Sequence, residues 1–91
     1  MTVNSAPTLD LPAYGEVQTG DPWLDLLGNL YLQACALDEA WDPAWGTSEA
    51  GAYLADASRA LCAAISYLPA EQYEQLAAAL SEAAPEWAIQ R

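Results

Sequence analysis

The sequence predicts an all-α protein, a small three-helix bundle, and three observations support this. Apolar residues recur at helical spacing in three segments, and no segment alternates apolar and polar residues as a strand would. Proline, aspartate and threonine stand where these segments begin, which is where helix-capping residues are common. The hydrophobic content of 54% can supply a core despite the high charge, so we expect the chain to fold.

Residues 1–20 are expected to form an extended N-terminal arm. Pro7, Pro12 and Gly15 interrupt this segment, and it shows no sustained periodicity. Residues 21–91 then form a single helical domain. Four apolar side chains of the arm could lie against that domain: Leu9, Leu11, Tyr14 and Val17.

The first helix is predicted over residues 22–40. Asp21 can accept a hydrogen bond from an amide of the first turn, and Pro22 suits the first helical position because no donor is needed there. On a helical wheel, one apolar stripe is expected to face the core: Trp23, Leu27, Leu30, Tyr31, Ala34, Leu37 and Trp41. The opposite side is expected to face solvent: Asp25, Asn29, Gln33, Ala36 and Glu39.

The second helix is predicted over residues 48–67, after a turn that contains Pro43 and Gly46. Thr47 or Ser48 can cap its first turn. Its inner stripe is rich in small residues, which allows another helix to approach closely. The stripe consists of Ala50, Leu54, Ala57, Ser58, Leu61, Ala64, Ile65 and Leu68.

The third helix is predicted over residues 70–83, because Pro69 stands at its start and Pro85 just after its end. A short C-terminal helical turn after Pro85 is expected to fold Trp87 and Ile89 back onto the bundle. The inner stripe of the third helix consists of Tyr73, Leu76, Ala77, Leu80 and Ala84.

The charge of the chain indicates the kind of partner. The chain has thirteen carboxylate side chains and only two basic ones, Arg59 and Arg91, and its formal net charge is −11. Such a field repels nucleic acid and anionic membranes and attracts basic protein surfaces. A GC-rich coding sequence would account for the absence of Lys, but it would not account for the scarcity of Arg. We therefore expect a partner with a basic surface, such as a nucleic-acid-binding protein or complex.

No catalytic site is expected. The chain lacks His and Lys, which supply most groups that titrate near neutral pH or form Schiff bases, and it has no glycine-rich phosphate loop. Cys35 and Cys62 are predicted to be reduced thiols that pack in the interior. The acids near residue 40 do not have the spacing of a calcium loop. We expect no enzyme activity, no cofactor and no metal ion.

A cytoplasmic location is expected. The start of the chain has neither a basic segment nor an apolar segment of the kind that directs secretion, and no stretch is apolar enough for a membrane span. Two cysteines are too few for a disulfide framework, although a bond between them stays open if their helices pack side by side.

The first candidate binding site follows the first helix. Asp38, Glu39 and Asp42 lie at the C-terminal end of that helix, where the macrodipole disfavours negative charge, so local stability does not explain them. Trp41 and Trp45 stand beside them, and an indole face attracts Arg and Lys. The segment is predicted to bind a basic surface. The alternative for Trp41 is that it closes the end of the core.

The second candidate site is an acidic row on the third helix, formed by Glu71, Glu74 and Glu82. Acids three or four residues apart on a helix are about 5–6 Å apart, which is close to the phosphate spacing along a DNA strand. The row could therefore imitate nucleic acid. The alternative is an ordinary solvated helix face.

Apolar residues on predicted outer faces favour a further interaction. These residues could form a patch for a homodimer or a partner helix. They are Leu32, Ala36, Ala52, Ala63 and Tyr67.

Three functions are consistent with these features. The first is a small inhibitor that occupies a basic, nucleic-acid-binding surface, in the manner of anti-CRISPR and other anti-defence proteins of phages. The second is an immunity protein or antitoxin that neutralises a nuclease toxin. The third is a helical assembly or adaptor protein whose acidity serves solubility. Salt separates the third function from the first two, because a steered acidic interface weakens in salt and an apolar one does not.

Overall fold

The computed structural model of the protein describes residues 14–89. Within this range it contains helices and no strand, which confirms the predicted small all-α bundle. The predictions for Leu9 and Leu11, and for the rest of residues 1–13, lie outside the described residues. The elements are α1 (Pro22–Ala40), α2 (Ser48–Ser66), α3 (Ala70–Ala83) and the short 3-10 helix η1 (Pro85–Trp87).

The helices begin where the capping residues predict. The Asp21 carboxylate accepts a hydrogen bond from the Trp23 amide at 2.9 Å, directly before Pro22. Thr47, not Ser48, caps α2, because its hydroxyl oxygen accepts a bond from the Ala50 amide at 3.0 Å. The bounds of α1 and α3 equal the predicted ones, and α2 ends one residue earlier than predicted.

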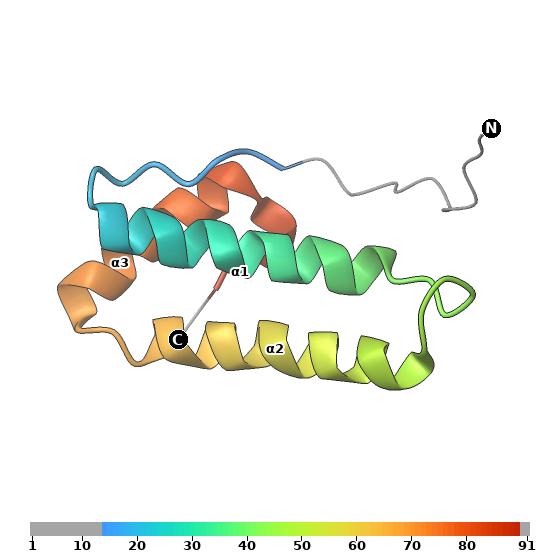
Figure 1. Ribbon diagram of the computed structural model, residues 1–91. Helices are drawn as coiled ribbons and strands as arrows, with labels where there is room; N and C mark the ends of the chain where they lie inside the picture. Colours follow the sequence, from blue (N-terminus) through green and yellow to red (C-terminus); the bar gives the residue numbers. More distant parts are fainter. Residues whose placement is uncertain (1–13, 90–91) are drawn as a thin grey trace.

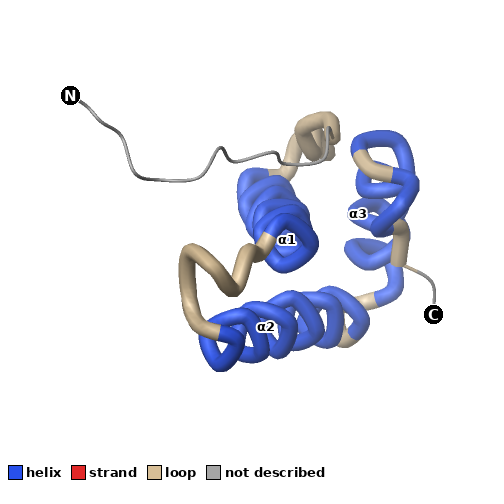
Figure 2. Tube along the Cα trace, turned by 90° about the vertical axis from the view of Figure 1, so that its right-hand side faces the viewer, coloured by secondary structure: helices blue, strands red, loops and turns tan. Residues whose placement is uncertain are grey.

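The helix α1 is the central element. It runs antiparallel to α2 along its length (Figure 1). Viewed along α1, α2 lies on one side of it and α3 on another (Figure 2). The main packing interfaces between α-helices are therefore those of α1 with each of the other two.

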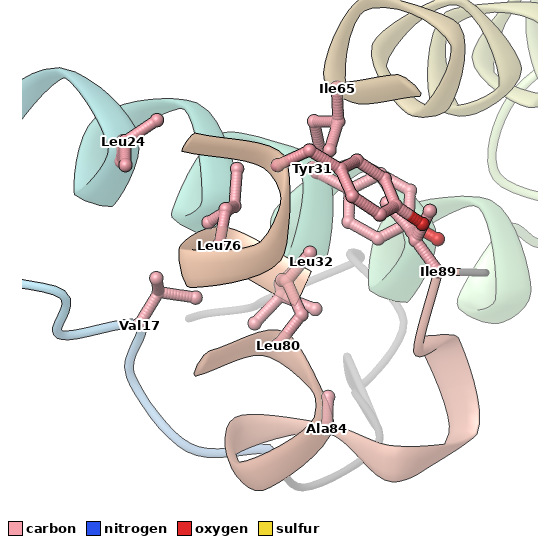
Figure 3. Packing of buried hydrophobic residues seen from close by; sticks show 10 residues of the cluster. Val17, Leu24, Tyr31, Leu32, Ile65, Leu76, Leu80, Ala84 and Ile89 are labelled. Carbon is pink, nitrogen blue, oxygen red and sulfur yellow. The ribbon is translucent and has the colours of Figure 1, made fainter. Parts of the chain in front are cut away.

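The core lies where α1, α3 and the segment before α1 meet. Leu80 lies beside Leu32, and Ile65 reaches this cluster from α2 (Figure 3). Ile65 is the only buried residue of α2. The cluster consists of Val17, Leu24, Tyr31, Leu32, Ile65, Tyr73, Leu76, Leu80, Ala84 and Ile89. The α3 members of the predicted stripe are thus confirmed as core residues, with Ala77 half-buried.

The buried face of α1 differs from the predicted one. Leu32 and Ala36, which were predicted to be outside, are fully buried, whereas Trp23, predicted to be inside, is 82% exposed. The reason is Gly28, which has no side chain on the face that meets α3. A Cβ atom at Gly28 would lie 2.8 Å from Leu76 Cδ1 and 3.0 Å from Val17 Cγ1. Because of this close approach, the Gly28 side of α1 is the buried side.

The extended segment of residues 14–20 lies across α1 and α3. The Gly15 amide donates to the Ala83 carbonyl at 2.7 Å, and the Val17 amide donates to Asn29 Oδ1 at 2.9 Å. Asn29 Nδ2 returns a bond to the Val17 carbonyl at 3.3 Å. Asn29, which was predicted to face solvent, is therefore half-buried and binds this segment.

The C-terminal turn folds back as predicted. The Tyr31 hydroxyl donates to the Trp87 carbonyl at 3.0 Å, and Ile89 is buried. The ring of Tyr14 meets the ring of Trp87 edge-on, with centroids 5.8 Å apart. The two ends of the described chain therefore pack together against α1.

Candidate protein-binding surfaces

Trp41 is fixed in the turn between α1 and α2. Its indole nitrogen donates to the Thr47 carbonyl at 3.0 Å. The ring packs on the backbone of Gly46 and Gly51, and a Cβ atom at Gly51 would lie 2.6 Å from Trp41 Cδ1. Trp41 is half-buried against the start of α2 and is not among the residues of the hydrophobic core, so its role in binding stays a prediction.

Trp45 stands at the surface of the same turn. Its ring meets the Trp41 ring edge-on, with centroids 5.3 Å apart and planes at 79°. The side chain is 61% exposed. Because Trp41 is itself fixed, Trp45 is an exposed aromatic residue with a defined position, which lowers the entropy cost of using it in an interface.

Asp42 has a structural role that the sequence analysis missed. Its carboxylate accepts a bond from the Ala44 amide at 2.8 Å. Its carbonyl accepts bonds from the Trp45 and Gly46 amides, both at 3.0 Å. An Asp at the first position commonly stabilises a turn in this way. The expectation that local stability does not explain Asp42 is therefore wrong.

Asp38 and Glu39 lie in the last turn of α1. Asp38 is half-buried and Glu39 is exposed, and neither carboxylate accepts a hydrogen bond from within residues 14–89. The carbonyl end of a helix disfavours negative charge, so their position costs stability. For Asp38 and Glu39, local stability still does not explain the negative charge.

The thiol next to these acids is not activated. Burial raises the pKa of Cys35, and the nearby Cys62, Asp38 and Glu39 raise it further, while the hydrogen bond with Tyr31 opposes them. A thiol must lose its proton to act as a nucleophile. Cys35 and Cys62 are free and half-buried, as predicted for packing cysteines.

The acidic groups find little positive charge in their own chain. In residues 14–89 the one ion pair joins Arg59 and Asp56 on α2. Both partners are largely exposed, so the pair contributes little stability. No cation of the described chain reaches Asp38 or Glu39.

The acidic row of α3 lies elsewhere. Glu71, Glu74 and Glu82 are exposed, as predicted. The α1–α2 turn and α3 lie on different sides of the molecule (Figure 2). The fold therefore does not bring the two candidate acidic sites together, and each must act as a separate surface. Glu82 also borders a shallow hollow next to Gly15 and Glu16.

The third surface is an apolar stripe on α1 that the sequence analysis assigned partly to the core. It consists of Trp23, Leu26, Leu30 and Leu37, which are 82%, 67%, 48% and 36% exposed. Their spacing of three, four and seven residues puts them on one side of the helix. A hollow with mainly apolar walls adjoins the stripe, and Asp21, Leu27, Leu68 and Gln72 are among the residues that border it.

The apolar patch predicted from the sequence is only partly at the surface. Leu32 and Ala36 are core residues, so they are not part of any patch. Tyr67, Ala52 and Ala63 are exposed as expected. The signal for the α1 stripe was present in the sequence, because α1 holds more apolar residues than one face can bury.

Comparison of the chain with protein-family models, with curated proteins and with solved structures found no match. Across residues 14–89, no helix is both long enough and apolar enough to cross a bilayer. In the same range, no three carboxylate or thiol groups gather in a way that could hold a metal ion.

Proposed function

We propose that the protein binds and inhibits a protein with a basic, nucleic-acid-handling surface, without catalysing a reaction itself. The proposed site is the α1–α2 turn, with Trp45 at its centre and Asp38 and Glu39 beside it. One observation carries the proposal. Trp45 is 61% exposed and its ring meets that of Trp41, in the turn that follows Asp38 and Glu39, two carboxylates that pair with no cation of the described chain.

The proposed site combines an exposed aromatic side chain with negative charge. An exposed tryptophan forgoes burial energy until a partner covers it, and tryptophans are common hot spots of binding. Its ring face attracts Arg and Lys, and the acids beside it attract the same groups. The net charge of −11 adds long-range steering toward a basic surface.

The proposal is tested by affinity capture with the full chain from lysate of its own cells. Captured proteins are identified by mass spectrometry after washing at about 0.05 M and about 0.5 M NaCl, which screen charges to different extents. A steered acidic interface should lose its partner in the higher salt. A nucleic-acid duplex should then compete with the protein for that partner, and the protein should reduce the partner's nucleic-acid binding.

Variants locate the site. Trp45→Ala should weaken binding by about 2 kcal/mol, roughly 30-fold, if Trp45 is a hot spot. The double variant Asp38→Lys/Glu39→Lys should abolish it. Asp42→Asn keeps a side-chain oxygen for the Ala44 amide, so it removes one charge without breaking the turn.

The matched control is Glu71→Lys/Glu74→Lys on α3, which changes the net charge by the same amount at a distance from the turn. It should reduce binding only slightly. Equal loss with both double variants would mean that total charge, not the turn, determines binding. Greater loss with the α3 variant would favour imitation of a phosphate track by α3.

An immunity protein or antitoxin against a nuclease would need the same surface. The identity of the captured partner separates this function from the inhibition of a defence complex. The variants and the salt dependence are expected to be the same for both.

A further inference from the structure

The exposed apolar stripe on α1 is large enough to need a partner. A tryptophan side chain offers about 150–250 Å² of surface. With the exposed parts of three leucines, the stripe reaches on the order of 400 Å², which is the size of functional patches on monomeric proteins. It is distinct from the α1–α2 turn, because Trp45 lies beyond the end of α1.

The stripe carries no charge. The positions that complete this side of α1 are Gln33 and Ala34. The one carboxylate within α1 before Asp38 is that of Asp25, and it turns away to accept bonds from the amide and hydroxyl of Thr19 at 2.7 and 2.6 Å. The hollow beside the stripe is bordered by one carboxylate, that of Asp21, which accepts the hydrogen bond of the Trp23 amide, and the rest of its walls are mainly apolar. The occupant is therefore expected to present a mainly apolar face.

We propose that the occupant is a second copy of the chain, with the two α1 helices packed antiparallel about a two-fold axis at Leu30. A two-fold interface must be complementary to itself. In this register Leu30 meets Leu30 of the second copy, and Trp23 lies opposite Leu37. The bulky end of each stripe thus meets the slimmer end of the other.

The hollow beside Trp23 supports the same register. It lies between the first half of α1 and the residues Leu68 and Gln72, and its walls are mainly apolar. Leu37 of the second copy would fill it, as a knob fills a hole between helices. The buried area per copy is smaller than the roughly 800 Å² of a standard interface, so the dimer should exchange readily with the monomer.

Charge gives the dimer a recognisable response to salt. Each copy has a net charge of −11, so association brings together two strongly acidic molecules. Salt screens this repulsion and leaves apolar contacts intact. Added salt should therefore strengthen the dimer, which is the opposite of its expected effect on the binding of a basic partner at the turn.

The test is sedimentation velocity of the full chain over a wide range of concentrations, at about 0.05 M and about 0.5 M NaCl. A monomer–dimer equilibrium that shifts toward the dimer in the higher salt is expected. Leu30→Asp should weaken the dimer at least 10-fold, because it removes two central apolar side chains and sets two carboxylates face to face. Leu30 is 48% exposed, so the variant should keep its helicity.

The control is Ala78→Asp, which adds the same charge on the outer side of α3 and should leave the dimer constant within about twofold. Trp45→Ala should also leave it unchanged, so failure of the dimer and failure of the turn site can be told apart. A monomer at every concentration and salt would overturn the proposal, as would a dimer that salt weakens or that Leu30→Asp does not affect. A dimer that appears only after removal of residues 1–13 would overturn it as well, because that segment would then be the occupant.

Discussion

Replacing Gly28 with alanine tests which face of α1 is buried. A buried and a solvent-exposed Gly28 predict changes of opposite sign in the free energy of unfolding. On a solvent-facing helix position, Gly→Ala stabilises a protein by about 0.5–1 kcal/mol. In the structure, the added Cβ atom would lie 2.8 Å from Leu76 Cδ1 and 3.0 Å from Val17 Cγ1. Both of these side chains are fully buried and have little room to move.

Overpacking a core of this kind costs about 1–3 kcal/mol. Subtracting the helix-propensity gain leaves a net loss of about 1 kcal/mol, or about 4–8 °C in Tm for a chain of this size. Urea unfolding and thermal melting, both followed by circular dichroism, measure the change. A higher Tm would refute the assignment of the Gly28 face to the core, and with it the exposure of the Trp23–Leu37 stripe.

A second substitution separates the clash from other effects. Val17→Ala removes the two methyl groups that crowd Gly28. In that background Gly28→Ala should be less destabilising than in the natural chain, and the difference is a coupling free energy. Additive effects of the two substitutions would mean that Val17 does not restrict the space at Gly28.

Two further predictions concern titrating groups. Hydrogen bonds from the side chain and backbone of Thr19 lower the pKa of Asp25 below its ordinary value of 3.8. The ionised carboxylate therefore stabilises the fold at neutral pH. This stabilisation is lost as the pH falls through the folded-state pKa. Thr19→Val should therefore raise the pKa of Asp25 in NMR titration and lower the free energy of unfolding at pH 7. The difference in stability between the natural protein and the variant should shrink at acid pH. A difference that does not change with pH would contradict a stabilising bond between Thr19 and the Asp25 carboxylate. Burial raises the pKa of Cys35, so iodoacetamide at pH 8 should modify Cys35 several-fold more slowly in the folded protein than in urea. Equal rates in the two states would contradict this.

The bounds of the helices could be predicted because their signals are local. Asp21 with Pro22, Thr47, and Pro69 each act on backbone groups within a few residues, and the structure places the helix starts at these points. The stripe of α3 was also predictable, since Tyr73, Leu76 and Leu80 are its large apolar residues and lie on one side. Such signals do not depend on the rest of the fold.

The orientation of α1 could not be predicted in the same way. Its apolar residues are spread over more than one face, with Leu24 and Leu32 on the buried side and Leu30 on the exposed side, and the periodicity favoured the wrong face. Trp23 falls on the apolar stripe of the helical wheel and was therefore predicted to face the core. The decisive residue was Gly28, whose lack of a side chain becomes informative only once Leu76 and Val17 are known to pack there.

The candidate site at the turn was partly predictable. The juxtaposition of Trp41 and Trp45 follows from their spacing around the turn, but the local role of Asp42 depends on backbone geometry that spacing alone does not define. The apolar stripe was missed for the same reason as the orientation of α1. Choosing the wrong core face assigns the true surface residues to the interior.

The way α2 is held determines which part of the molecule can open by itself. Its single buried side chain, Ile65, lies in its last turn, and no residue of its first three turns is buried. Amide protons of these turns should therefore exchange with solvent through a local opening that leaves α1, α3 and residues 14–20 folded. Such an opening would also release Trp41 from Gly46 and Gly51. The position of Trp45, and hence partner affinity at the turn, is then tied to a local folding equilibrium of α2.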